Sequence, residues 1–270
     1  MSTLSLAAGA RCTVTEPGVA AQSVLTVFDL VWPQQSNHHG TLFGGAALAM
    51  LDRLAFIMGS RALRGTVVTA AVSRLDFRAP IPTGQLIECR ARVGRRGGRS
   101  ALIHTRLVTE DALSGERNVC IVGDFTMVRR ADSEGAAADA ALATGSGVAD
   151  VAEADGDGAP AAVRVAEIVF PGHANHRGIL HGGAAMEWIA KAGFIAASRH
   201  LRRSVVLASS ERLCFVAPAH VGDVVEVDAR VCGVGRRSVR VRARMWAEHP
   251  ATGQRRFCTS ANLVYVATDD

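Results

Sequence analysis

The stretch 37–56 reads NHHGTLFGGAALAMLDRLAF and combines a polar loop, paired glycines and a nearly continuous apolar run. The run has apolar residues on almost every face of a helix, which predicts a helix over 44–62 that is buried on nearly all sides. Asp52 lies within this helix, where a core residue is expected. Because a buried carboxylate without partners is costly, Asp52 must either have partners or face a cleft.

The same pattern occurs again 138 residues later in the chain. The segment NHHGTLFGG (37–45) matches NHRGILHGG (175–183) at six of nine positions, and the offset continues without a gap. It also aligns SRALRGTVV with SRHLRRSVV, and RLDFRAP with RLCFVAP. An offset that holds over roughly a hundred residues is typical of an internal repeat, so the chain is predicted to contain two copies of one structural unit.

The repeat divides the chain into four parts. We expect an N-terminal extension (1–21), a first unit (22–130), a linker (131–160) and a second unit (161–270). The linker segment is rich in Ala, Gly and Asp, and burial of its few apolar side chains cannot offset the entropy of ordering it. It is predicted to be flexible, and a short exposed helix is the alternative.

Each unit shows the same order of elements. In the first unit a strand over 24–33 precedes the helix, and four segments with β-branched, alternating character follow it. Residues typical of turns lie between these four segments. One long helix followed by antiparallel strands predicts an α+β fold, in which a curved sheet wraps around the helix. The four segments are 67–77, 85–96, 100–111 and 118–128.

Composition narrows the class of protein without choosing a ligand. The chain of 270 residues is 49% hydrophobic, so it can bury one large core or two ordinary ones. Its net charge of +5 fits an anionic small molecule as well as a nucleic acid. The start of the chain has no secretory pattern and no run is long enough to span a bilayer, so we expect a soluble, cytoplasmic protein.

The cysteines give no sign of a metal or redox site. None forms a CxxC pair or has a histidine close in sequence, so all are expected to be small buried thiols. They are Cys12, Cys89, Cys120, Cys214, Cys232 and Cys258.

The second copy serves as a control for the charged residues of the helix. Arg53 corresponds to Lys191, and Glu187 lies four residues before that lysine, the spacing of an exposed ion pair on a helix. Asp52 corresponds to Ala190, so the fold does not require an acid at this position. Each helix also begins with free backbone N–H groups, which can hold a carbonyl oxygen or an anion. A carboxylate and a row of donors therefore point to one site.

Taken together, these motifs resemble those of the hotdog-fold acyl-CoA thioesterases. The pattern is Asn-x-x-Gly-x-x-[Phe/His]-Gly-Gly, then an Asp seven residues beyond the second glycine, then ValValThrAla, PhexxPro and GlyArgSer. The resemblance covers both copies, about 22–130 and 160–268, and the tandem arrangement is similar to that of double-hotdog members. It implies two units, each a five- or six-stranded antiparallel sheet around a long helix, packed as a pseudo-dimer.

The resemblance also implies a catalytic site between the units. In this family the acid of one helix works with the Asn and the helix N-terminal amide of the other unit. One site would therefore join Asp52 to Asn175 and to the backbone amide of Gly182. Asp52 would act as general base or nucleophile, and the sequence leaves both routes open.

The reciprocal combination lacks an acid and is expected to be degenerate. It would join Asn37 and Gly44 to Ala190, which cannot perform acid–base chemistry. Substrate is expected to contact residues beside the competent site and arginine-containing turns suited to phosphate, although those turns can equally be exposed basic loops. The assigned residues are Thr69, His181, Gly183, Arg99, Ser100, Arg237 and Ser238.

These features favour an acyl-CoA hydrolase that releases a carboxylic acid and coenzyme A. It would need no cofactor or metal, contact no nucleic acid or membrane, and associate as a trimer of double-hotdog chains. A non-catalytic acyl-CoA binder or sensor of the same fold is the main alternative. A dehydratase or hydratase would require a histidine beside a carboxylate, and the histidines of the two loops are the candidates. They are His38, His39, His176 and His181.

Overall fold

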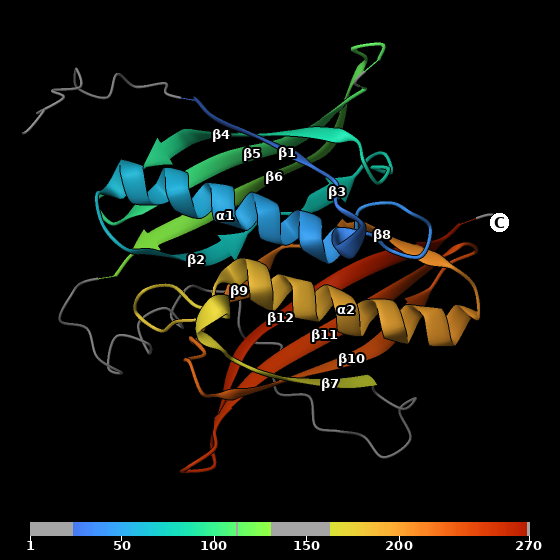
Figure 1. The fold of residues 1–270 in the computed structure, drawn as a ribbon. Coiled ribbons are helices and arrows are strands. Elements are labelled where there is room, and N and C mark those ends of the chain that lie inside the picture. The colour runs from blue at the N-terminus through green and yellow to red at the C-terminus, as the bar shows by residue number, and fades with distance from the viewer. Residues whose placement is uncertain (1–23, 112, 131–162, 269–270) are drawn as a thin grey trace, which may run out of the picture.

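The computed structural model describes residues 24–111, 113–130 and 163–268 (Figure 1). The predicted N-terminal extension and linker lie outside the described residues. Within the described part, neither long helix is apolar enough over sufficient length to cross a membrane.

The first half of the structure is a long helix that lies across a curved antiparallel sheet (Figure 1). The helix α1 (Gly44–Leu63) extends one residue beyond the predicted range. The first strand is shorter than predicted, because a 3-10 helix η1 (Pro33–Gln35) follows it. The strands are β1 (Val24–Leu30), β2 (Val67–Val72), β3 (Leu75–Phe77), β4 (Leu86–Arg96), β5 (Ser100–Glu110) and β6 (Arg117–Arg129).

The second half repeats this arrangement element by element. The 3-10 helix η4 (Pro171–His173) precedes the helix α2 (Gly182–Leu201), which covers the other end of the sheet in Figure 1. The strands are β7 (Val163–Ile168), β8 (Val205–Ser210), β9 (Leu213–Phe215), β10 (Val224–Val234), β11 (Ser238–His249) and β12 (Gln254–Ala267).

The two halves share one twelve-stranded sheet. Its main path runs β1-β4-β5-β6-β2-β9-β12-β11-β10-β7, and the halves join where β2 pairs with β9 and β3 pairs with β8. The helices α1 and α2 pack against each other on the inner face of this sheet. The predicted α+β double hotdog, with a helix wrapped by antiparallel strands in each unit, is confirmed.

The segment 67–77 is two strands, not one. Its pairing with β6 shifts register between Thr69 and Ala71, and the chain leaves the strand conformation at Ser73 and Arg74. The break has a structural use, because β2 can then pair with β9 while β3 pairs with β8. A single straight strand could not contact both neighbours in the other half.

The helix α1 is buried on all sides except one narrow stripe. Arg53, Ile57 and Arg61, spaced four residues apart, form this exposed stripe, and the rest of the helix is buried or half-buried, as the apolar pattern predicts. In α2 the expected ion pair with Glu187 is replaced by another, since Lys191 pairs with Glu167 of β7.

The thiols follow the prediction in part. Cys89, Cys120 and Cys258 are buried, whereas Cys214 is half-buried and Cys232 is exposed.

The glycine pairs at the helix starts allow α1 and α2 to approach closely. A Cβ at Gly183 would lie 2.9 Å from the Cα of Ala49 and 3.3 Å from the Cβ of Asp52. In the reciprocal contact, a Cβ at Gly45 would lie 3.0 Å from the Cα of Glu187. Each helix N-terminus therefore sits against the middle of the other helix, and only glycine leaves room for this.

We expect Gly183→Ala to lower the free energy of unfolding by about 1–3 kcal/mol, the usual cost of overpacking a close contact. The added methyl group would meet backbone atoms of α1, which cannot rotate away. Gly98→Ala is the control, because no atom lies within 4 Å of its Cβ position. Urea unfolding of both variants measures the difference, and equal stabilities would contradict the close-packing explanation.

Candidate active site

Asp52 lies at the contact between α1 and the start of α2. The hydroxyl of Thr69 donates a hydrogen bond to Asp52 Oδ1 at 2.6 Å, and the backbone N–H of Gly183 donates to Asp52 Oδ2 at 2.7 Å. The first partner comes from β2 of the same unit and the second from the N-terminus of α2 in the other unit. Both carboxylate oxygens are therefore held, and one of them is held across the unit boundary.

Burial changes the acidity of this carboxyl group. Only 1% of Asp52 is exposed, and this burial raises its pKa from the ordinary value of 3.8 to about 6. The hydrogen bonds from Thr69 and Gly183 oppose the rise, because they stabilise the charged form. The pKa lies near neutrality, so Asp52 can both take up and release a proton under ordinary conditions.

Asn175 belongs to the loop that leads into α2. Its side-chain oxygen Oδ1 accepts hydrogen bonds from the backbone N–H groups of Arg177 and Ile179, at 2.9 and 3.2 Å. The turn is completed by Gly178, whose φ of 71° lies in the left-handed region that favours glycine. The loop thus fixes the carboxamide of Asn175 in place.

A cavity of about 50 Å³ lies next to the residues that surround Asp52. Thr69 and Gly182, which both line it, separate it from the carboxylate, and Asn175 forms part of its wall. His181 also lines it and packs edge-on against Phe56, with 5.1 Å between the ring centres. Burial lowers the pKa of His181, with smaller contributions from the positive charges of Arg53 and His176, so its neutral form is favoured.

The reciprocal cavity, between the start of α1 and the second unit, has the same architecture and different chemistry. Asn37 holds an equivalent turn, since its Oδ1 accepts from the backbone N–H groups of His39 and Thr41. The position of Asp52 is occupied by Ala190, and that of Thr69 by Leu207. This cavity measures about 360 Å³ and contains no acid among the described residues that line it.

Two equivalent hydrogen bonds tie the loops across the boundary. His38 in the first unit contacts Ser204 of the second at 3.0 Å, and His176 in the second contacts Thr66 of the first at 2.7 Å. The cavity beside Asp52 and the reciprocal cavity, called the twin cavity below, are therefore related by a pseudo-two-fold arrangement. The loop histidines do not contact Asp52, whose hydrogen-bond partners within the described residues are Thr69 and Gly183.

The structure divides the predicted phosphate-binding residues between the two cavities. Arg99 and Ser100 lie next to the end of β6, beside the cavity of Asp52, since the Arg99 carbonyl accepts from Arg129 N–H at 2.8 Å. Arg237 and Ser238 lie at the equivalent turn beside the twin cavity.

Sequence reasoning missed Arg130, which lines the cavity beside Asp52. It directly follows β6, and its counterpart in the second unit is Thr268. An alignment of the two copies could have identified it, because the cation of Arg130 aligns with the neutral side chain of Thr268.

The metal prediction can be compared with the described side chains. No group of three or more His, Cys, Asp or Glu side chains in the part of the chain that the structure covers is placed to hold a metal ion.

Comparison with known proteins gives a consistent family. A model described as "Thioesterase superfamily" matches twice, at residues 39–115 and 177–254. Mouse acyl-coenzyme A thioesterase 11 is 28% identical over 89% of this chain, and the match covers 46% of the mouse protein. The chain spans about half the length of the curated mammalian relatives that it matches.

The chain is also similar to solved bacterial structures. An acyl-CoA hydrolase from Agrobacterium tumefaciens is 38% identical, covers 93% of this chain and 97% of its own, and superimposes with a TM-score of 0.40. A structure from Lactobacillus plantarum, provisionally named an oleoyl thioesterase, has a TM-score of 0.61 over 93% of this chain and 99% of its own. At 11% identity this second likeness shows the fold alone.

We expect the stability of the protein to depend on pH through Asp52. The folded-state pKa is raised above the unfolded value, so ionisation disfavours the fold, and stability falls as pH rises from 3.8 to about 6. The fall should approach about 3 kcal/mol at about 1.36 kcal/mol per pKa unit.

The variant Asp52→Asn keeps the side-chain shape but cannot ionise, so it should not show this fall. Urea unfolding of both proteins between about pH 4 and about pH 8 measures the effect. If the stability of the wild type and of Asp52→Asn changed with pH in the same way, ionisation of Asp52 would not be the cause of the pH dependence.

Proposed function

The chain belongs to the thioesterase superfamily, and from this premise we propose that it hydrolyses an acyl-CoA thioester to a carboxylic acid and coenzyme A. The observation that carries the proposal is the placement of Asp52. A buried carboxylate with a pKa near neutrality is held against a helix N-terminus, and its neighbours Thr69 and Gly182 line a cavity of about 50 Å³. Clustering of a perturbed acid and backbone donors at a cavity is typical of an active site.

The amide of Gly182 is the proposed donor to the thioester carbonyl. When the carbonyl carbon is attacked, negative charge develops on its oxygen, and fixed N–H groups stabilise that charge without reorganising. Gly182 lines the cavity, whereas the next amide, that of Gly183, is already used by Asp52. The two successive amides of α2 would then have different tasks, one for the substrate and one for the acid.

Asp52 is the proposed acid–base group. As a general base it would take a proton from the attacking water and then return it to the departing thiolate of coenzyme A. As a nucleophile it would instead attack the carbonyl carbon and expel the coenzyme A thiolate, which leaves an acyl anhydride that water then cleaves to the carboxylic acid and free Asp52. The same geometry supports both routes, and they share the requirement that Asp52 be ionised.

Asn175 is proposed to donate to the water or to the carbonyl through its NH₂ group. Its Oδ1 is occupied by two loop amides, so the acceptor side of the carboxamide is not available for this task. Its position in the cavity wall supports a role in orienting the reactants. Thr69, in contrast, is proposed to position Asp52 instead of contacting substrate, because its hydroxyl donates to the carboxylate.

Arg99, Ser100 and Arg130 are proposed to contact the phosphates of coenzyme A. Arg130 lines the cavity, and the turn with Arg99 and Ser100 is joined to the adjacent end of β6 by a backbone hydrogen bond. Arginine side chains match the geometry of phosphate oxygens.

The assembly remains a prediction, with three chains as the proposed number. The exposed side chains of Val24, Phe28 and Trp32, on and next to the edge strand β1, support association through this edge.

We expect Asp52→Asn to lower turnover by about a hundredfold or more, the range for loss of a general base. Asn175→Ala should also lower turnover strongly, while Asn37→Ala, its counterpart in the degenerate combination, should change it little. The measurement is release of coenzyme A, followed with a thiol-reactive dye over a panel of acyl-CoAs. Equal losses from Asn175→Ala and Asn37→Ala would contradict a single competent site.

The pH dependence of turnover gives a second readout of the same experiment. Because Asp52 must be ionised, the rate should increase as pH rises through about 6 and then level off. Release of no coenzyme A from any acyl-CoA would favour the alternative of a non-catalytic binder.

Restoring the missing side chains should restore a second site. Ala190→Asp with Leu207→Thr would place a carboxylate opposite the N–H of Gly45 and a hydroxyl beside it, as in the competent site. In the Asp52→Asn background we expect this double substitution to raise turnover by about tenfold or more, part of the general-base contribution. Ala190→Asn with Leu207→Thr is the matched control, and equal rates in both would contradict the predicted reciprocity.

A further inference from the structure

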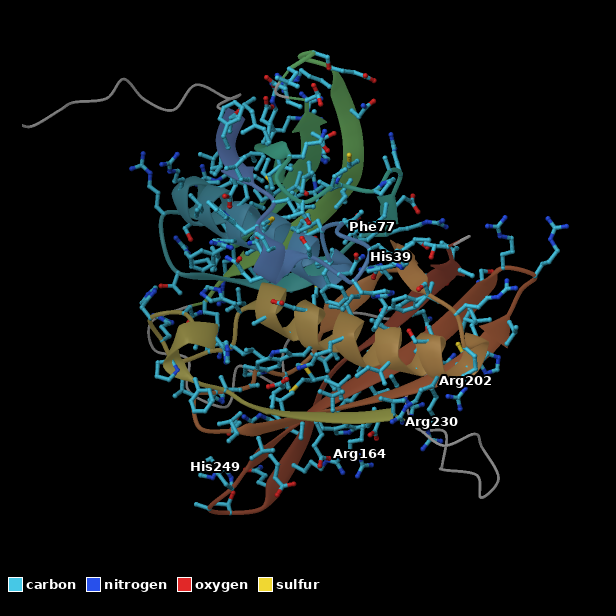
Figure 2. The ribbon with its side chains drawn as sticks, turned by 45° about the vertical axis from the view of Figure 1, so that its right-hand side comes forward. His39, Phe77, Arg164, Arg202, Arg230 and His249 are labelled. Atoms are coloured by element: carbon cyan, nitrogen blue, oxygen red, sulfur yellow. The ribbon has the colours of Figure 1, made fainter. Side chains whose placement is uncertain are left out.

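The twin cavity is large enough to hold a ligand. Its volume of about 360 Å³ compares with about 50 Å³ beside Asp52, and lies within the range of roughly 300–1,000 Å³ for small-molecule sites. It is bounded by the start of α1, the strand β8 and the segment that follows β3. Figure 2 shows two of its lining residues, His39 and Phe77, close together where the two halves meet.

Three polar positions of the site around Asp52 are apolar in the twin cavity. The positions of the acid, the hydroxyl and the imidazole are taken by Ala190, Leu207 and Phe43. Ala190 and Leu207 are buried, and Phe43 packs edge-on against Phe194 at 6.3 Å between ring centres. Each of these three changes removes a polar group, which favours a hydrocarbon ligand over a polar one at this end of the cavity.

The described lining of this cavity also includes polar side chains, which are Asn37, His39, Thr41, Arg78 and Thr268. Among the described residues that line it, the ionisable side chains are His39 and Arg78, and neither is an acid. Arg78 is exposed, and His39 contacts Thr268 at 3.4 Å. A largely apolar lining with one exposed cation, Arg78, is complementary to an acyl chain that carries an anionic head group.

We propose that the twin cavity binds an acyl chain with an anionic head group and does not cleave it. With Ala190 in place of an acid, a bound thioester finds no carboxylate to activate water or to attack the carbonyl, so the ligand leaves unchanged. The proposal deepens the proposed function and rests on it for the class of ligand. The head group can be a coenzyme A thioester or the carboxylate of a free fatty acid, which share the chain and the negative charge.

The test is calorimetric titration of the full chain with S-decyl-coenzyme A, a thioether that cannot be hydrolysed. The proposed function requires one equivalent at the site of Asp52, and the twin cavity adds a second, so we expect about two equivalents bound per protein chain. The variant Ala47→Met places a longer apolar side chain into the twin cavity, whose wall Ala47 forms, and should leave about one equivalent.

A second variant keeps the test independent of how well Ala47→Met folds. Phe43→His installs the residue found at the same position of the competent site and adds a polar ring to the apolar end of the cavity. It should weaken the second binding event by about fivefold or more, because the imidazole must lose its hydration when the chain binds. Circular dichroism melting curves confirm that each variant is folded.

The possible results separate this proposal from the proposed function. One equivalent in the wild type, unaffected by Ala47→Met, would overturn the second acyl site and leave the hydrolase intact. Two equivalents, with no coenzyme A released from decanoyl-CoA, would support the second site and overturn the hydrolase. No binding of the thioether would overturn both.

Titrations with decanoate and with coenzyme A alone show whether the bound acyl chain belongs to a free fatty acid or to an acyl-CoA. Decanoate binding that Ala47→Met abolishes supports the proposal and assigns the site to a free fatty acid. Sensitivity to Ala47→Met with the thioether alone supports it and assigns the site to an acyl-CoA. If coenzyme A alone bound at this site as tightly as the thioether, the proposal would be overturned, because the acyl chain would contribute nothing to the binding affinity.

Discussion

The close approach of two helix starts to each other's midsections is the constraint on which the rest of the molecule depends. It requires glycine at both helix N-termini. It also places the backbone nitrogen of Gly183, whose N–H has no partner within its own helix, 2.7 Å from Asp52 Oδ2. The backbone donor repays part of the cost of burying the carboxylate, and Thr69 supplies the remaining direct contact. One packing contact thereby fixes the relative position of the units and the environment of the acid.

Much of this arrangement could be predicted because the sequence contains its own control. The repeat predicts two units and their order of elements, and the pair Asp52 and Ala190 identifies the asymmetric position. The break at Ser73 and the shift at Thr69 were not predictable, since both depend on pairing with strands far away in sequence. The fold is therefore largely a matter of local pattern, while the shape of the site is a matter of tertiary contact.

The side chains around the site show where sequence reasoning reaches its limit. Asp52 could be expected to have partners, but the sequence does not say that Thr69 turns toward the acid and not toward a ligand. It also does not predict the sizes of the two cavities, because Leu207 and Phe43 replace polar residues without filling the space that they line. Cavity volume depends on how several elements pack together, and no short motif records it.

Fusion of the two units in one chain explains why they can differ. In a symmetric pair of identical units, each acid would occur twice, and both copies would carry the penalty of a buried carboxylate. Within one chain, Ala190 removes that penalty from the second unit, while Gly183 of the same unit still donates to Asp52 and Gly182 and Asn175 still line the adjoining cavity. The second helix can thus lose its own acid and still be needed for the first, and this dependence keeps the shared packing while leaving the twin cavity free to change.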